Sequence, residues 1–212
     1  MQMSYKYGLL LGCFIAALVV ANTIASKLLM VGGVVITAGI IAYPLTFLFT
    51  DIISEVWGKK VAKYTVWAGL AANIVMVLLY TIAVHLPHAV FWEGQAAFSQ
   101  VLGAVPRIFI ASMLAYLISQ TWDIWMFHLI KDKYGSGRLW LRNNISTATS
   151  QVIDSVVFLM VAFYGVIPIE QMPGMLLGYV VIKWIIALVD TPLVYLGVAW
   201  ARKESNHESY YC

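Results

Sequence analysis

The chain has 212 residues, of which 62% are hydrophobic and only 11% are charged, and its formal net charge is +3. A soluble domain carries about 25% charged residues, so this composition excludes an ordinary soluble protein and indicates a membrane protein. Six apolar runs have the length of about 20 residues that an α-helix needs to cross a bilayer. The six predicted membrane-spanning segments are residues 7–29, 36–56, 62–84, 107–130, 145–167 and 175–200.

These segments use almost the whole chain and leave no room for a soluble catalytic domain. We expect residues 1–201 to form one all-α membrane domain, a six-transmembrane-helix bundle, and residues 202–212 to form a disordered cytoplasmic tail. Gly58-Lys59-Lys60 lacks the glycine that a phosphate-binding loop carries five residues earlier, where Ile53 stands. Metal-ligand and nucleophile motifs are also missing. The sequence therefore predicts a protein that is not an enzyme, with no catalytic residue, metal site or cofactor.

The basic residues predict the orientation in the membrane. Ten Lys and Arg residues lie on one side of the predicted spans, whereas only Lys27 and Arg107 lie on the other. The ten are Lys6, Lys59, Lys60, Lys63, Lys131, Lys133, Arg138, Arg142, Arg202 and Lys203. Because basic loops stay in the cytoplasm, both termini are predicted to be cytoplasmic, as an even number of spans requires. These loop residues explain the net charge, so we expect no nucleic-acid partner.

The first predicted span carries a stripe of small residues and one buried amide. Ala17, Ala21 and Ala25 recur at a spacing of four, which permits close helix packing inside the chain and would also suit docking of a partner subunit. Asn22 lies beside this stripe. An amide at this depth requires hydrogen-bond partners, so Asn22 is a candidate binding residue.

The second predicted span combines a proline with two carboxylates. Pro44 is expected to kink the helix and to free a carbonyl that could line a cavity. Asp51 and Glu55 are four residues apart and therefore share one helix face. Glu55 is interpreted as reaching the inner interface and pairing with Lys59, whereas the deeper Asp51 is a candidate ligand-binding residue.

The fourth predicted span follows a long outer connection, residues 85–106, which reads either as an amphipathic interfacial helix or as a substrate gate. Arg107 begins the span and could anchor it at lipid headgroups or bind substrate. Gln120 and Asp123 follow at a spacing of three and combine an amide with a carboxylate.

The last two predicted spans repeat this chemistry. Gln151 and Asp154 are three residues apart in the fifth span, so that an amide and a carboxylate face one ligand edge. Lys183 and Asp190 are two helical turns apart in the sixth span. We expect Lys183 to pair with Asp154, either as a coupling element or as a purely structural ion pair.

Five charged residues thus lie inside apolar spans, namely Asp51, Asp123, Asp154, Lys183 and Asp190. Each would cost roughly 2.5–3.5 kcal/mol at mid-membrane if it were isolated. These side chains must therefore face one another, a water-filled cavity or a polar ligand. This pattern predicts a transporter.

The chain resembles the queuosine precursor transporters, also called the vitamin uptake transporter family. The resemblance rests on motifs in order along nearly the whole chain. They are Asn22, Pro44 followed by FLFTD ending at Asp51, Arg107-Ile-x-x-Ala-Ser-x-x-Ala-Tyr with Gln120 and Asp123, Ser146-Thr147 leading to Asp154, and Lys183. It implies a six-helix protein of the bacterial inner membrane that takes up 7-deazaguanine bases such as preQ0, preQ1 or queuine for tRNA queuosine salvage. Glu55 and Gln151 match the family pattern only loosely.

The chemistry of such a base suits these side chains. A carboxylate can accept its N1–H and 2-amino groups together, while Gln, Asn, Arg or Lys can donate to O6. Trp122 or Phe49 could stack on the ring. The expected substrate-binding residues are Asn22, Asp51, Arg107, Gln120, Asp123, Gln151, Asp154 and Lys183, and the expected coupling or ion-pair residues are Asp154, Lys183 and Asp190.

Three functions remain open from the sequence. The first is a stand-alone carrier for a 7-deazaguanine, in the lipid bilayer as a single chain or as a homodimer. The second is the substrate-binding membrane subunit of an ATP-driven vitamin importer, which would need separate energy-coupling subunits. The third is an intramembrane lipid enzyme, for which Asp51 and Glu55 would have to hold a metal ion.

Overall fold

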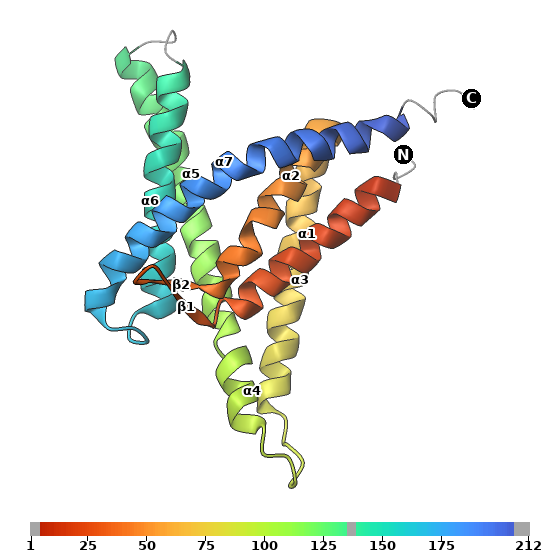
Figure 1. Ribbon diagram of the computed structural model, residues 1–212, viewed down its shortest axis with the longest axis vertical. Coiled ribbons are helices and arrows are strands. Elements are labelled where there is room, and N and C mark those ends of the chain that lie inside the picture. Colours follow the sequence, from red (N-terminus) through yellow and green to blue (C-terminus); the bar gives the residue numbers. More distant parts are fainter. Residues whose placement is uncertain (1–4, 135–138, 206–212) are drawn as a thin grey trace. The chain divides into compact units, whose positions relative to one another are not determined.

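The computed structural model describes residues 5–134 and 139–205 (Figure 1). Its helices, labelled α, and 3₁₀-helices, labelled η, are joined by one pair of strands. The elements in chain order are α1 (Tyr5–Ile24), β1 (Leu28–Val31), β2 (Val34–Thr37), η1 (Ala38–Ile41), α2 (Tyr43–Trp57), α3 (Lys59–His85), α4 (Gln95–Leu102), α5 (Val105–Tyr134), α6 (Leu139–Phe163), η2 (Ile169–Gln171) and α7 (Met172–Ser205).

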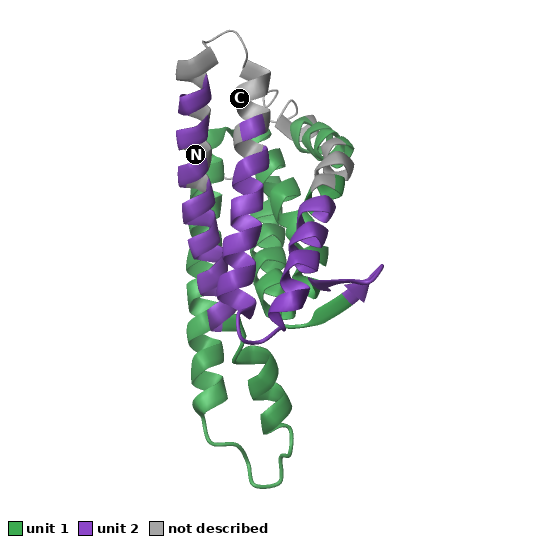
Figure 2. Cartoon of the chain, turned by 90° about the vertical axis from the view of Figure 1, so that its left-hand side faces the viewer, with its two compact units in different colours: residues 1–29, 37–105, 183–212 green, residues 30–36, 106–182 purple. Residues whose placement is uncertain are grey.

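The chain divides into two compact units, coloured separately in Figure 2. Unit 1 comprises residues 1–29, 37–105 and 183–212, and unit 2 comprises residues 30–36 and 106–182. α7 contributes its first part to unit 2 and the remainder to unit 1. Each unit is described by itself below.

Unit 1 is built on the mutual packing of α1, α2 and α3, with the C-terminal part of α7 added. Its buried core is formed by Tyr7, Leu10, Ile52, Ile53, Val198 and Ala201. Gly197 on α7 lies directly against the Ile52 side chain, and a Cβ at this position would collide with it. The glycine thus permits close approach of α7 to α2, because it presents no side chain at the contact.

The ends of the described chain meet at one end of unit 1. Lys6 Nζ donates to the Trp200 carbonyl over 2.8 Å and lies 4.8 Å from the centre of the Trp200 ring. Arg202 pairs with Glu55 at 2.6 Å. The prediction that Glu55 pairs with Lys59 is therefore wrong. The reason is that α7 remains helical as far as Ser205 and brings a guanidinium to the end of α2. The cytoplasmic location of this end stays a prediction.

A two-stranded β-hairpin separates the first two long helices. Gly32 and Gly33 have φ values of 57° and 80°, as the two central residues of a tight hairpin turn require. The segment 34–37, Val-Val-Ile-Thr, consists of β-branched residues, which favour strands. The prediction of continuous helices is therefore wrong at the end of the first span, 7–29, and at the start of the second span, 36–56. The all-α expectation missed this hairpin, because its residues are as apolar as a membrane helix.

Pro44 does not lie in a helix interior. It occupies the first turn of α2, where its missing N–H removes no hydrogen bond because the first helical N–H groups have no partner within the helix. The predicted kink at Pro44 is therefore wrong. The proline instead helps to define where α2 begins.

The alanine stripe of α1 is covered from within the chain. Ala17, Ala21 and Ala25 are all buried. A Cβ at Gly39 of η1 would lie only 2.8 Å from the Ala21 carbonyl oxygen and 3.0 Å from the Ala25 Cβ atom. The prediction of close packing is confirmed. The stripe is not an open docking face for a partner subunit, because η1 already lies on it.

Four stretches among the described residues are long and apolar enough to cross a membrane. They are Tyr5–Ile24, Ala38–Trp57, Lys59–His85 and Gln95–Ser119. Ala148–Phe163 is a shorter apolar helix within the fifth predicted span, and α7 covers the range of the sixth. The helical architecture of a membrane protein is therefore present, while the count of six spans stays a prediction.

Candidate functional site

Polar side chains link α5 and α6 within unit 2. Ser119 Oγ on α5 lies 3.4 Å from Asp154 Oδ1 on α6, and Trp122 Nε1 donates to Thr149 Oγ1 over 3.2 Å. The pairs 119–154 and 122–149 run in opposite directions along the two helices, so α5 and α6 are antiparallel. Asp154, which was expected to face a ligand from the fifth predicted span, therefore lies against α5.

Asp154 presents a carboxylate beside α5. The Ser119 hydroxyl has a single proton and is also 3.1 Å from the Tyr116 carbonyl oxygen, so its contact to Asp154 is shared. Asp154 is half-buried. An ionised carboxylate acts only as an acceptor, which suits the N–H groups of a ligand.

Gln151 adds an acceptor that the described residues leave without a partner. Its Oε1 atom is buried and makes no hydrogen bond within the part of the chain that the structure describes. Leaving such an atom unsatisfied costs about 1–3 kcal/mol, so native proteins usually provide a donor. Its spacing of three from Asp154 puts both acceptors on one side of α6.

Serines lie beside these two residues on α6, and α5 carries a pair of tryptophans. Ser150 and Ser155 are buried, and Ser155 donates back to the Gln151 carbonyl over 2.9 Å. The rings of Trp122 and Trp125 have centroids 5.1 Å apart. The indole N–H of Trp122 is held by Thr149, which orients a ring large enough to stack on a planar ligand.

Arg107 closes the other end of the same helix pair. Its guanidinium donates to the carbonyl oxygens of Val161 over 2.8 Å and of Tyr164 over 2.6 Å. These carbonyls belong to the end of α6, where helical hydrogen bonding runs out and Gly165 turns the chain with a φ of 77°. The structure thus gives Arg107 a role in joining α5 to α6; its expected role in substrate binding stays a prediction.

Asn22 occupies a different environment, inside unit 1. Its Nδ2 atom donates to Asn73 Oδ1 over 2.7 Å, and Asn73 donates to the Gly69 carbonyl over 2.9 Å. Both amides are buried, at 6% and 1% exposure. Sequence reasoning missed Asn73, although an amide in the middle of an apolar span was a usable signal. Here the pair joins α1 to α3.

The remaining expected site residues are spread over both units. Asp51 is exposed on α2 in unit 1. Lys183 is half-buried where unit 1 resumes on α7, whereas Asp154 belongs to unit 2, so their pairing stays a prediction. The side chains of Gln120, Asp123 and Asp190 lie outside the described residues.

Ser119, Thr149 and Ser155 were not expected as site residues, because single hydroxyls in helices are common helix–helix contacts.

Comparisons with known proteins agree on one family. The family described as "Putative vitamin uptake transporter" matches residues 37–197. A Bacillus subtilis protein named "Probable queuosine precursor transporter" is 31% identical over 180 residues, which cover 84% of this chain and 79% of that protein. The Escherichia coli "Queuosine precursor transporter" is 29% identical over 128 residues, 60% of this chain and 55% of that protein. No solved structure matches the chain.

Proposed function

This chain belongs to the vitamin uptake transporter family, and from that premise we propose that it carries queuosine precursors across a bacterial cell membrane. Family membership makes it a multi-pass membrane transporter and not an enzyme. The more specific proposal is import of a 7-deazaguanine base, preQ0, preQ1 or queuine, through the inner membrane. The observation that carries it is the pair of acceptors Gln151 and Asp154 on α6, beside the tryptophan-bearing helix α5.

The proposed recognition follows from the hydrogen-bonding edges of the base. Asp154 accepts the N1–H and the 2-amino group together, since a carboxylate can take two parallel donors. Gln151 accepts a further N–H of the ring or of its substituent through Oε1, which satisfies the unpartnered oxygen. Trp122 stacks on the ring. Gln120 and Asp123 of α5 and Asp51 of α2 are proposed as additional polar contacts.

We propose a stand-alone carrier. Asp154 and Lys183 are proposed as its coupling or ion-pair residues, together with Asp190. The alternative is a substrate-binding subunit of an ATP-driven importer. The alanine stripe was the surface expected to bind its partner subunit, and η1 already covers that stripe. A homodimer remains a proposal without a structural observation of its own.

Ligand binding to the detergent-purified protein tests the proposal. The parent should bind preQ0 or preQ1, and Asp154→Asn should weaken binding by at least several hundredfold, because two hydrogen bonds to a charged acceptor contribute about 1.5–3 kcal/mol each. Glu55→Gln is the matched control, since Glu55 lies at the exposed end of unit 1 and pairs with Arg202. Equal affinity of the parent and Asp154→Asn would refute this recognition model.

A further inference from the structure

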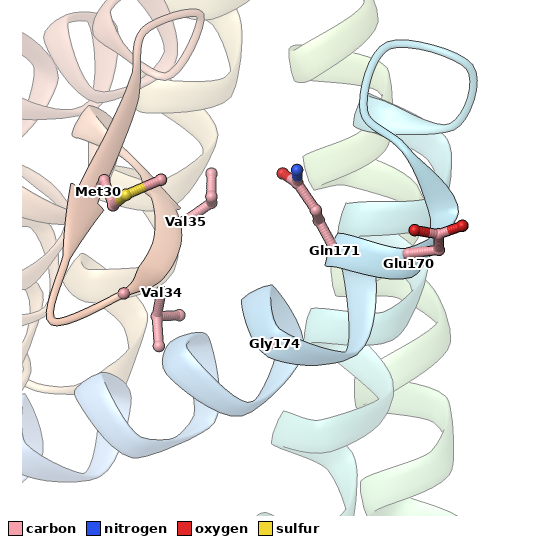
Figure 3. A pocket seen from close by; sticks show the side chains of 7 residues that line it. Met30, Val34, Val35, Glu170, Gln171 and Gly174 are labelled. Carbon is pink, nitrogen blue, oxygen red and sulfur yellow. The ribbon is translucent and has the colours of Figure 1, made fainter.

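A pocket of about 310 Å³ lies at the β-hairpin within unit 2 (Figure 3). One wall comes from the hairpin and the other from η2 and the first turn of α7. The lining residues are Met30, Gly33, Val34, Val35, Glu170, Gln171 and Gly174. Ligand sites span roughly 300–1,000 Å³, so this volume suits a small molecule such as a two-ring heterocycle.

The hairpin wall is fixed against α7. A Cβ at Gly178 would lie 2.5 Å from the Val34 Cγ1 atom and 3.4 Å from the Ile36 Cγ2 atom, so β2 packs directly on the backbone of α7. Gly174, one turn earlier, faces open space, with no heavy atom within 4 Å of a built Cβ. The contact at Gly178 therefore holds the strand in place, while Gly174 keeps the pocket open.

The polar side chains of the pocket differ in direction. In Figure 3 the amide of Gln171 extends toward the hairpin, whereas the carboxylate of Glu170 points away from it. The Gln171 side chain makes no hydrogen bond within the described part of the chain. The pocket therefore presents one amide, which has both donors and an acceptor, opposite an apolar wall of Met30 and two valines. The Glu170 carboxylate lines the pocket but is directed away from the hairpin.

This combination fits a planar, uncharged ring system with a hydrogen-bonding edge. The Gln171 amide can pair with adjacent N–H and carbonyl groups on the edge of the ring, and the Met30 thioether and valine methyl groups can cover its face. The connections that form the pocket lie on the side opposite the ten basic loop residues, which is the predicted outer side.

We propose that this pocket is an outer docking site that captures the ring of the incoming base before it reaches Gln151 and Asp154. The inference rests on the proposed function and adds a second binding site to it. Because the site precedes translocation, it should raise the occupancy of the transporter at low external concentration without changing the maximal rate.

Transport kinetics in reconstituted vesicles test the site. Gln171→Leu removes the amide, and Gly174→Leu fills the open space without an existing contact to displace. Gln171→Leu should raise the KM for preQ0 about five- to 150-fold at an unchanged maximal rate, because two neutral hydrogen bonds contribute about 0.5–1.5 kcal/mol each. Gly174→Leu should also raise KM, because the leucine side chain occupies the space of the ring. Glu55→Gln is the control, because Glu55 lies in unit 1, pairs with Arg202 and does not line the pocket, and it should leave KM unchanged.

Cysteine protection gives a readout that does not depend on transport. In a chain whose native cysteines at positions 13 and 212 are changed to serine, Met30→Cys, which keeps the Gln171 amide, should react with a membrane-impermeant maleimide added outside. preQ0 should slow this reaction. It should do so equally in a chain that also carries Asp154→Asn and no longer takes up the base.

The two proposals fail in different ways. Normal parent uptake with unchanged KM in Gln171→Leu and Gly174→Leu, or no protection by preQ0, would overturn the outer site alone. A parent chain that neither binds nor transports a 7-deazaguanine would overturn the proposed function and the outer site with it.

Discussion

The side chains that make the α5–α6 face polar are held by small hydroxyl groups. Ser119 and Thr149 each contact a larger group of the proposed site, Asp154 and Trp122 respectively. A hydroxyl in a helix also bonds its own backbone, as Thr149 does to Ile145 over 2.8 Å, which limits its rotation. The geometry of the acceptor pair thus depends on residues with no charge of their own.

The buried amide pair of unit 1 provides a stability prediction. Asn22→Leu and Asn73→Leu should each lower the free energy of unfolding by about 1–3 kcal/mol, because each leaves a buried amide without its partner. The double variant should lose less than the sum, with a coupling of about 0.5–1.5 kcal/mol. Unfolding of the purified protein in mixed micelles measures this, and strictly additive losses would show that the 2.7 Å contact carries no energy.

The expected pairing of Lys183 with Asp154 can be tested in the same way. Lys183→Gln alone should destabilise the protein by up to about 3 kcal/mol, since it leaves a carboxylate without a cation, and half-burial keeps the effect below that of a fully buried pair. Adding Asp154→Asn should recover part of the loss. If the double variant is the less stable of the two, the residues do not form a pair.

At the scale of whole elements, the tight contacts of glycines decide how closely the helices approach. Gly39→Val places methyl groups where the Ala21 carbonyl and the Ala25 side chain already lie, so we expect a loss of about 1–3 kcal/mol in unfolding free energy. Gly12→Ala on α1, the helix against which η1 packs, is the control, because nothing lies within 4 Å of its built Cβ. Thermal unfolding in detergent distinguishes the two, and equal melting temperatures would contradict the packing.

The long helices could be predicted from the sequence because apolar runs of about 20 residues have one main structural use. The predicted third span, 62–84, lies within α3, which begins earlier, at Lys59, because the basic run is helical too. The hairpin could not be recognised by hydropathy, since its strands are also apolar. Its local signals were Gly32-Gly33 and the β-branched run at 34–37. Pro44 was misplaced for the same reason, because the predicted helix began too early and put the proline inside it.

The candidate site was predicted in part for a related reason. Carboxylates and long amides inside apolar spans are expensive, and Gln151 and Asp154 could therefore be singled out. Their partners could not, because Ser119 and Thr149 resemble ordinary helix-packing residues. The pairing of Glu55 with Arg202 depends on tertiary structure over a separation of 147 residues.

At the scale of the molecule, the distribution of basic residues predicts the orientation in the membrane. In a chain without its native cysteines, Glu93→Cys in the exposed connection before α4 should react with an impermeant maleimide added outside intact cells. Ser136→Cys, outside the described residues, should react only after the membrane is opened. The reverse pattern would contradict the orientation and place the hairpin pocket on the cytoplasmic side.

The central claim is that this chain by itself carries a 7-deazaguanine across a membrane. The most direct test is uptake of labelled preQ0 or preQ1 into liposomes that contain only the purified chain, without ATP or other subunits, beside liposomes with Asp154→Asn. We predict saturable uptake by the parent and none above background by Asp154→Asn. Binding of the base by the parent without any uptake would contradict the account and indicate a subunit that needs an energy-coupling partner.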